Sequence, residues 1–371
     1  MTITTKRLHR RSVLAAAATL PLAPGLGAPA IAQSRRKVTL VYAIQTIDSA
    51  ADGFFGALPI GLGFYADEGL DVEIQTVAGA AAAVNLLVNG RAEFTTHGTA
   101  GLFTGVDKGV PMKGFICQIP DYFLSIAVDR NGPVTRLEDL KGKTIGVPAA
   151  SGSPMFVTKA VLKNLGWDPD KDVEFLAVGA GLPALDAFKR GRVQALVAFD
   201  SVFALFEYHG ADFRYFRPPP VPSLGFTHTT NTTLSVLEKD PAVALGVGRA
   251  MIKSLVYMAA APAEELTKLH FKVFPASRSS SMSEAEALRL DALRQKARLA
   301  FMRPKQRVFD RTEQLGDATD AEIIGQRDLL FSGGEIKTQH PAAAYFTRQF
   351  IAEYNKLDVA ALVEKAKSYR A

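Results

Sequence analysis

Two stretches with the same pattern decide the fold, LLVNGRAEFTTHG (residues 86–98) and AFKRGRVQALVAFDS (residues 187–201). Each begins at the end of an apolar helical pattern, turns at a Gly-Arg pair, continues as a short apolar run and ends in polar residues. Glycine permits the left-handed turn that ends many helices, and a short apolar run bounded by turn signals is typical of a buried strand. The sequence therefore predicts the same helix–strand unit once in each half of the chain.

The residues around these two units predict strands that alternate with helices. VTLVYAI (38–44) has the continuous apolar character of a strand buried on both faces, and KTIGVP (143–148) opens a second series. Strands separated by helices are typical of parallel β-α-β units. We predict an α/β fold of two lobes, each a mostly parallel sheet flanked by helices, with hinge crossings near residues 122–126 and 224–229. The predicted division is 38–124 for the first part of lobe 1, 125–222 for lobe 2, and 223–371 for the return to lobe 1 with C-terminal helices.

The N-terminus has the pattern of an export signal. Residues 1–32 combine a basic start, an apolar stretch broken by prolines and the small-x-small ending Ala30-Ile31-Ala32. The apolar stretch is too short to span a bilayer. The pair Arg10-Arg11 resembles a twin-arginine signal but lacks its usual Phe and Lys, so both twin-arginine and general secretory export stay open. We predict cleavage near Ala32 and a periplasmic mature protein.

Composition narrows the class of protein. Of the formal charge of +6, four units come from the N-terminal segment, and the remaining Lys and Arg are scattered among acids. A nucleic-acid binder would show a dense basic stripe, so nucleic acid is not an expected partner. The single cysteine, Cys117, lies in an apolar run and predicts a buried side chain and no disulfide. The six histidines lack paired metal-ligand spacing, and no metal or cofactor is expected.

Polar residues follow four of the predicted strands, in residues 45–55, 95–99, 149–156 and 199–201. Open parallel sheets bind ligands beyond the carboxyl ends of their strands. Each of these residues also has a local interpretation. Ser153 could be a helix N-cap, and His97 could be a histidine beside a turn. Asp48 and Asp200 could be solvated or capping residues, and Asp121 could shape the hinge. Their convergence at one end of the sheets favours a small-molecule site. The predicted ligand-binding residues are Gln45, Asp48, Ser49, Phe54, Thr96, His97, Thr99, Asp121, Ser151, Gly152, Ser153, Phe199, Asp200 and Ser201.

Several of these motifs resemble one family. Residues 42–98, LEDLKGKTIGVP (137–148), GRVQALVAFDS (191–201) and residues 230–265 are similar to the periplasmic substrate-binding proteins of the nitrate/sulfonate/taurine ABC transporter family, the SsuA-like proteins, which are related to binding proteins and enzymes for the thiamine pyrimidine precursor. The resemblance covers about Val38 to Glu265. It implies a periplasmic-binding-protein type II fold that closes over a small organic molecule, a membrane permease as partner, and a monomer.

More than one kind of ligand and more than one role agree with this sequence. The four loops contain no Lys or Arg, whereas Asp48 and Asp200 suit an amine or an aminopyrimidine edge, so a nitrogen-bearing or aromatic ligand is favoured over a sulfonate. Helix starts could still bind an oxyanion through backbone N–H groups. An enzyme of the pyrimidine-precursor synthase type is disfavoured because the cysteine-rich motif is missing, and no catalytic residue is predicted. A ligand-sensing partner of a signalling receptor would have the same fold.

Overall fold

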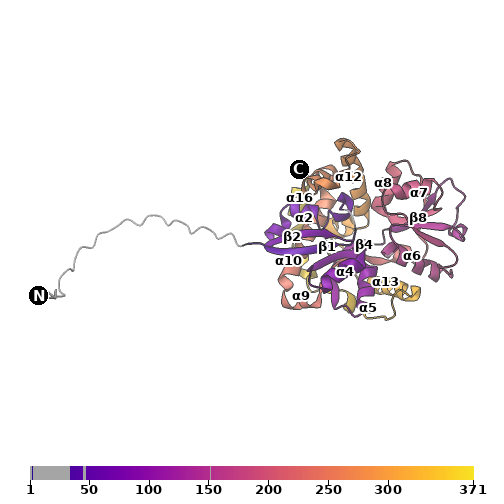
Figure 1. The fold of residues 1–371 in the computed structure, drawn as a ribbon. Helices are drawn as coiled ribbons and strands as arrows, with labels where there is room; N and C mark the ends of the chain where they lie inside the picture. Colours follow the sequence, from indigo (N-terminus) through magenta and orange to yellow (C-terminus); the bar gives the residue numbers. More distant parts are fainter. Residues whose placement is uncertain (1, 3–33, 45–46, 151) are drawn as a thin grey trace. The chain divides into compact units, whose positions relative to one another are not determined.

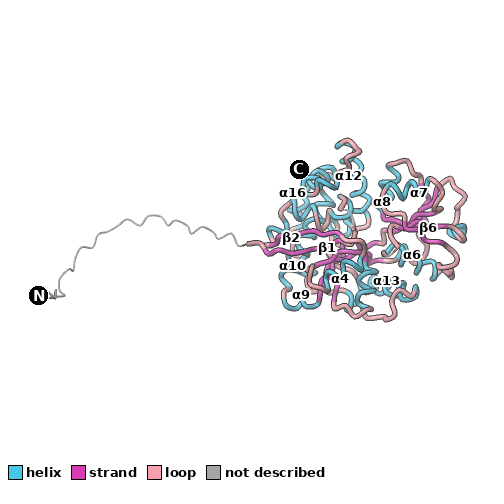
Figure 2. Tube along the Cα trace, viewed as in Figure 1, coloured by secondary structure: helices cyan, strands magenta, loops and turns pink. Residues whose placement is uncertain are grey.

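The computed structural model describes residue 2 and residues 34–371, apart from 45, 46 and 151. The predicted export signal, except for residue 2, and the predicted site residues Gln45 and Ser151 therefore lie outside the described residues. Residues 35–371 form one compact unit. Within it the chain builds two separate five-stranded sheets, each covered by helices (Figures 1 and 2).

The first sheet has the strand order β2-β1-β3-β10-β4 and forms the centre of lobe 1. β1 pairs parallel with β2 and β3, while β10 runs antiparallel to β3 and β4. Four strands thus share one direction and the return strand opposes them. Their bounds are β1 Arg36–Tyr42, β2 Leu70–Thr76, β3 Phe94–Gly98, β4 Met112–Asp121 and β10 Gly225–Thr233.

The second sheet, in lobe 2, repeats this design with the order β7-β6-β8-β5-β9. β6 pairs parallel with β7 and β8, and β5 runs antiparallel to β8 and β9. The prediction of two mostly parallel sheets is confirmed. The bounds are β5 Leu124–Asp129, β6 Thr144–Val147, β7 Glu174–Ala177, β8 Ala195–Phe199 and β9 Phe213–Phe216.

Helices cover both sheets. Three belong to lobe 2, α6 Ser153–Asn164, α7 Leu182–Lys189 and α8 Asp200–Tyr208, and surround β8 in Figure 1. The others are α1 Ser49–Asp52, α2 Ala57–Gly61, α3 Phe64–Asp67, α4 Ala80–Val88, α5 Thr99–Asp107, α9 Leu234–Lys239, α10 Pro241–Ala260, α11 Ala263–Val273, α12 Glu284–Ala300, α13 Asp320–Gly333, α14 Ala342–Tyr345, α15 Ile351–Tyr354 and α16 Val359–Lys367.

The two Gly-Arg units have the predicted form. Gly90 and Gly191 both adopt positive φ (67° and 72°), which ends α4 and α7 and turns the chain into β3 and β8. Each strand is followed by a helix without an intervening loop, since α5 begins at Thr99 and α8 begins at Asp200. The polar residues at these two strand ends are thereby held on regular elements, not on loops.

Alternate side chains of β8 pack against apolar clusters on opposite faces of the lobe 2 sheet. Val197 of β8 packs in one apolar cluster with Ile145 and Trp167, while its neighbour Leu196 packs with Phe203 in a second cluster. Successive strand side chains point to opposite faces, so one strand supplies both cores.

Lobe 1 has one larger core, built around α10. This helix is long and apolar enough by composition to cross a membrane, but 72% of its most apolar window is buried inside the protein. α10 is therefore the central core helix of lobe 1.

Two local expectations are wrong. The N-cap of α6 is Gly152, and Ser153 is its first helical residue without a capping hydrogen bond from its side chain. The sequence of residues 343–357 predicts one of the C-terminal helices, but this segment forms only the single turns α14 and α15, because Phe346 between them is extended.

The crossings between the lobes differ from the predicted ranges, since the first is shorter and the second lies earlier along the chain. The first consists of Tyr122 and Phe123, between β4 and β5, and the second runs from residue 217 to residue 224. Residues 124–126 and 225–229 already belong to strands. The two crossings lie side by side, because Gly225 pairs with Asp121 across the first sheet.

Candidate functional site

Polar side chains of lobe 1 gather where β1, β3 and β4 end and β10 begins. Tyr42 is the last residue of β1, and Thr96 and His97 lie near the end of β3. Because β10 runs in the opposite direction, its N-terminal part reaches the same edge, with His228 opposite Gly98. The four strands thus bring their polar ends to one edge of the sheet, as the parallel arrangement predicts.

Buried hydrogen bonds link these residues. The Gln118 amide lies 2.9 and 3.0 Å from the Thr96 hydroxyl, and His228 Nδ1 donates to Gln118 Oε1 at 2.7 Å. His97 Nδ1 donates to the Gly98 carbonyl at 3.0 Å, and its Nε2 lies 3.3 Å from Asn231 Nδ2, which donates to it. These bonds form two buried sets, one of Thr96, Gln118 and His228 and one of His97, Gly98 and Asn231, and each set holds its polar groups in one orientation.

Burial keeps both histidines neutral. It lowers the pKa of His97 to about 4, although the bond to Gly98 opposes the shift, and it lowers the pKa of His228 well below the usual value, with nearby Arg298 and His97 acting in the same direction. A neutral imidazole has one donor and one acceptor nitrogen; His97 uses both within the protein, and His228 uses its donor on Gln118.

The pKa of His97 predicts an acid-sensitive fold. A histidine with a lowered folded pKa contributes stability that is complete above about pH 6.5 and is lost as pH falls towards 4, because the unfolded chain binds the proton first. For His97 the loss between pH 7.5 and 5.0 is about 2 kcal/mol. Urea unfolding at both pH values measures it. His97→Gln, which keeps an amide in place of the imidazole, should lose about 2 kcal/mol less than wild type over this range, and equal losses would contradict the prediction.

Lobe 2 contributes the starts of two helices. Asp200 and Ser201 open α8 and are buried, and Phe199 before them is partly exposed. Ser153 opens α6 and touches lobe 1, since a methyl group on Gly98 would lie 2.5 Å from Ser153 Oγ. Only glycine at position 98 allows the end of β3 and the start of α6 to approach this closely.

Two arginines of α12, which the sequence reasoning missed, connect the lobes. Arg298 Nε donates to both carboxylate oxygens of Asp200 at 3.0 and 2.9 Å, and Arg298 NH2 donates to Ser201 Oγ at 3.3 Å. Arg294 NH2 donates to Asp48 Oδ2 at 2.8 Å, and its Nε donates to the Ser201 carbonyl at 3.1 Å. Arg294 therefore joins the loop after β1 of lobe 1 to α8 of lobe 2.

An aromatic wall accompanies Arg298. The guanidinium lies 4.7 Å from the centre of the Phe123 ring, and Phe123 stacks on Phe199 at 5.5 Å with planes 29° apart. Cation–π contact and ring stacking both favour flat groups lying parallel. The first crossing and the end of β8 thus supply an apolar, planar surface next to the ion pairs.

The remaining acid of the cluster, Asp291, also lies on α12. Its Oδ1 accepts a hydrogen bond from Arg294 at 3.1 Å, and Ser49 lies beside it. Burial raises the pKa of the Asp291 carboxyl, while Arg294 opposes the shift and Asp48 adds to it. The cluster of three acids and two arginines therefore carries a net charge no more negative than about −1. Its members are Asp48, Asp200, Asp291, Arg294 and Arg298.

Three predicted site residues are engaged elsewhere. Phe54 is buried in the core of lobe 1. The Thr99 hydroxyl donates to the Phe226 carbonyl at 2.7 Å. Asp121 pairs with Arg303 at 2.7 Å beside the crossings. The contacts between the lobes involve the predicted residues Asp48, Ser153, Phe199, Asp200 and Ser201, together with Gly98, Phe123, Arg294 and Arg298. Ser49 lies beside Asp291, Gly152 caps α6, and Thr96 and His97 lie near the end of β3 with Tyr42, Gln118 and His228 on the neighbouring strands.

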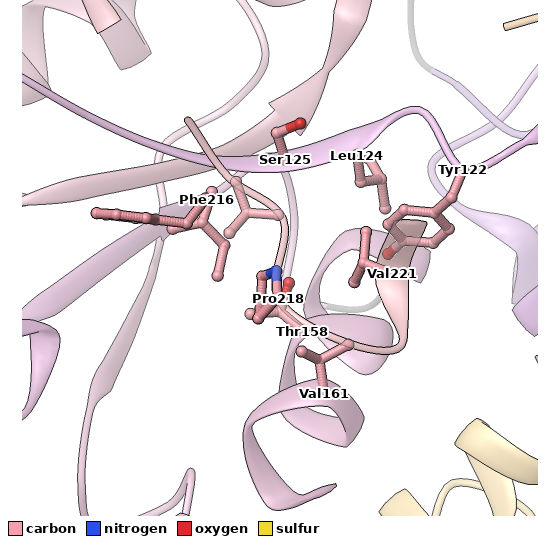
Figure 3. Close-up of a pocket in the computed structure, with 10 residues that line it drawn as sticks. Tyr122, Leu124, Ser125, Thr158, Val161, Phe216, Pro218 and Val221 are labelled. Atoms are coloured by element: carbon pink, nitrogen blue, oxygen red, sulfur yellow. The ribbon is translucent and has the colours of Figure 1, made fainter. Parts of the chain in front are cut away.

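Two cavities lie outside this cluster. One, of about 20 Å³, lies beside the crossings and is lined by Tyr122, Leu124, Thr158 and Val221 among others (Figure 3). It has room for about one water molecule. The other, of about 400 Å³, lies between the end of α10, the start of α11 and α12. None of the predicted site residues lines either cavity.

The cysteine and the possible metal ligands bear on whether the described residues form a reactive site. Cys117 is buried, and burial raises the pKa of its thiol to about 12, which keeps it an unreactive thiol. Within residues 34–371, leaving out 45, 46 and 151, no group of three or more His, Cys, Asp or Glu is placed to hold a metal ion.

Comparison with known proteins decides the family. The model of the family described as NMT1/THI5 like matches residues 59–265, more than half of the chain. The chain belongs to the NMT1/THI5-like family. No protein with a curated description matches the sequence. The predicted resemblance to SsuA-like proteins is confirmed, since an SsuA is among the similar solved structures of this NMT1/THI5-like chain.

Three solved structures illustrate the fold of this NMT1/THI5-like protein. A protein from Bordetella bronchiseptica RB50 is 20% identical, with a TM-score of 0.65 over 87% of this chain and 98% of that one. The ligand-binding component of an ABC-type import system from Staphylococcus aureus, with zinc bound, is 12% identical (TM-score 0.60; 87% and 100% covered). The aliphatic sulphonate binding protein SsuA from Escherichia coli is 13% identical (0.58; 84% and 92%). The protein has the two-lobed fold of periplasmic binding proteins.

Proposed function

We propose that the protein is the solute-binding component of an ABC import system, which captures a small organic molecule between its lobes and delivers it to a membrane permease. The observation that carries this proposal is the meeting of strand ends from lobe 1 with helix starts from lobe 2. In this proposal Thr96, His97 and His228 line one side of the site, and Phe199 and Asp200 line the other; the contact of Gly98 with Ser153 and the bonds from Arg294 to Asp48 and Ser201 support it. The solute-binding proteins among the similar structures support the same role.

The contacts of the two acids change the argument about the ligand. Asp48 and Asp200 were expected to be available for an amine, but Arg294 and Arg298 already bind them. A free cation would have to displace an arginine, and a free anion would have to displace a carboxylate, leaving a buried charge unpaired. We therefore propose a ligand with little net charge and a flat apolar part, an aromatic or nitrogen-bearing compound, which lies against Phe199.

Export completes the proposal. The basic start, the apolar stretch and the Ala30-Ile31-Ala32 ending of the N-terminal segment support a signal peptide cleaved near Ala32. A protein that delivers solute to a permease from outside the inner membrane must be exported, so the two proposals agree. The mature protein then works in the periplasm as a monomer.

A thermal-shift screen tests the function. Neutral aromatic compounds, pyrimidines, amines, aromatic acids and sulfonates are added at increasing concentration. A true ligand should raise the melting temperature in proportion to the logarithm of its concentration once this exceeds the Kd, and at a hundred times the Kd it should stabilise the protein by about 2.7 kcal/mol. His97→Ala and Asp200→Ala should each raise the Kd for the ligand at least tenfold. Arg289→Ala changes an exposed residue of α12 and should leave the Kd unchanged. If a ligand is found and both site variants bind it like wild type, the site assignment is wrong.

A further inference from the structure

Two helix pairs of different chemistry make the larger helix contacts between the lobes, beside a smaller contact of α5 with α6. We name them the α6–α13 contact and the α12–α8 contact, after the helices that meet in each. α6 and α8 belong to lobe 2, whereas α12 and α13 belong to the C-terminal part of the chain (Figure 1).

The α6–α13 contact is apolar and close. Gly333 lies on Ala160, and a methyl group on Gly333 would come within 2.4 Å of the Ala160 Cβ. Val157, Ala160 and Val161 of α6 share one buried cluster with Ile323, Leu329 and Leu330 of α13. At the exposed margin, Asn164 Nδ2 donates to Ser332 Oγ at 2.7 Å. Separating these helices would expose apolar surface to water, and the free-energy cost would be about 25 cal/mol for each Å² exposed.

The α12–α8 contact includes the buried ion pair and hydrogen bonds described above. Arg298 binds Asp200 and Ser201, and Arg294 binds the Ser201 carbonyl. Polar groups that separate can bind water instead, so the net cost of breaking such bonds is about 0.5–3 kcal/mol each. This contact can therefore open at lower cost than an apolar one of similar extent.

The start of α13 is anchored at the crossings. Glu322, in the first turn of α13, pairs with Arg303 at 2.9 Å, and Arg303 pairs with Asp121 at the end of β4. Glu322 also lies against the second crossing, since a methyl group on Gly225 would be 2.5 Å from its Cγ. α13 thus runs from the crossings, at its N-terminus, to α6 of lobe 2, at its C-terminus.

α6 itself lies against both crossings. Figure 3 shows Thr158 and Val161 of α6 near Val221 and Pro218 of the second crossing, around the 20 Å³ cavity that Tyr122 of the first crossing also lines. The α6–α13 contact is therefore next to both crossings, whereas the α12–α8 contact touches the first crossing through Arg298, which lies 4.7 Å from the centre of the Phe123 ring.

We infer that the α6–α13 contact is a fixed pivot and that the lobes separate at the α12–α8 contact, with Arg294 and Arg298 holding that side shut. Rotation about a pivot beside the crossings keeps the apolar surface of the α6–α13 contact covered. On the other side it breaks hydrogen bonds of Arg294 and Arg298, which water can replace, and loosens the packing of Arg298 on Phe123. Solute would enter past α12 and α8. This inference extends the proposed function to the mechanism of entry, but it concerns the free protein and can be tested without a ligand.

Hydrogen–deuterium exchange tests the pivot. In the double variant Arg294→Ala/Arg298→Ala, amides of peptides covering residues 47–55 and 199–208 should exchange at least tenfold faster than in wild type. Peptides from α6 and α13 should keep wild-type rates. Arg289→Ala, on the exposed side of α12, is the matched control and should change neither. Faster exchange in α6 and α13 equal to that in α8 would overturn the inference, as would unchanged exchange in α8.

A cross-link gives the second measurement. Asn164→Cys/Ser332→Cys joins two exposed positions of the α6–α13 contact, and the only native cysteine, Cys117, is buried. In the double-arginine background, oxidation of this pair should leave the fast exchange of residues 199–208 unchanged, because the pivot does not need to open. If oxidation restores wild-type protection in α8, the two contacts open together and the pivot is refuted. Either result stands whether or not the screen finds a solute.

Discussion

Arg298→Ala is expected to lower the free energy of unfolding by about 3 kcal/mol. The Arg298 and Asp200 side chains are 7% and 3% exposed, so removing the guanidinium leaves a buried carboxylate without its partner. We expect the lower end of the range for a broken buried pair, because Asp200 regains water when the α12–α8 contact opens. Urea unfolding at pH 7.5 measures the change.

A double-mutant cycle separates the ion pair from the rest of the side chain. Arg298 also packs on Phe123, so part of its loss is lost packing. Arg298→Ala/Asp200→Ala removes the orphaned charge and should be more stable than the sum of the two single changes by at least about 1 kcal/mol. Arg289→Ala should lie within about 0.5 kcal/mol of wild type. An Arg298→Ala variant as stable as Arg289→Ala would show that the pair contributes nothing.

Phe103→Ala is expected to cost about 3–5 kcal/mol, more than any of the other single substitutions. Phe103 is fully buried in α5, with its ring 4.3 Å from Tyr345 and 6.0 Å from Phe226, centre to centre. Truncation leaves a cavity between a helix, β10 and the C-terminal segment, and these elements cannot all collapse into it. α5 follows His97 and Gly98 directly, so the variant should also bind solute less tightly.

Phe103→Leu is the matched control for this prediction. It retains most of the apolar volume and should cost about 1.5 kcal/mol, measured in the same urea titrations. Ring-specific packing would be excluded if the two variants were equally unstable. A cost below about 1 kcal/mol for Phe103→Ala would mean that Tyr345 and Phe226 close the gap.

The local pattern of the sequence predicts much of the fold correctly because its signals are short in range. Gly90 and Gly191 end helices through a backbone conformation that glycine adopts readily, and this holds whatever surrounds them. The apolar runs around Phe94 and Val197 need burial on both faces, which only a covered sheet supplies. The interpretation of Ser153 as the N-cap of α6 is wrong, since Gly152, one residue earlier, takes the N-cap position and Ser153 is the first helical residue.

The site was only half predictable. The polar ends of β3 and β8 follow from the strand pattern, and the structure brings Thr96, His97 and Asp200 into one region. Arg294 and Arg298 gave no local signal, since two basic residues four apart on an amphipathic helix ordinarily face solvent. Asp48, the partner of Arg294, lies 246 residues away in the sequence, and Asp200, the partner of Arg298, lies 98 residues away. His228 and Gln118 likewise gain their roles only through the antiparallel pairing of β10.

By itself, the sequence determined the elements of this protein, their alternation and the division into two similar sheets, because helix ends, strand burial and turns depend on residues close together in the chain. Only the tertiary structure decided the charges of the site. Whether Asp48 and Asp200 stand free or paired depends on how α12 packs between the lobes, and that packing results from apolar burial and ion pairing among segments hundreds of residues apart, which no local pattern records.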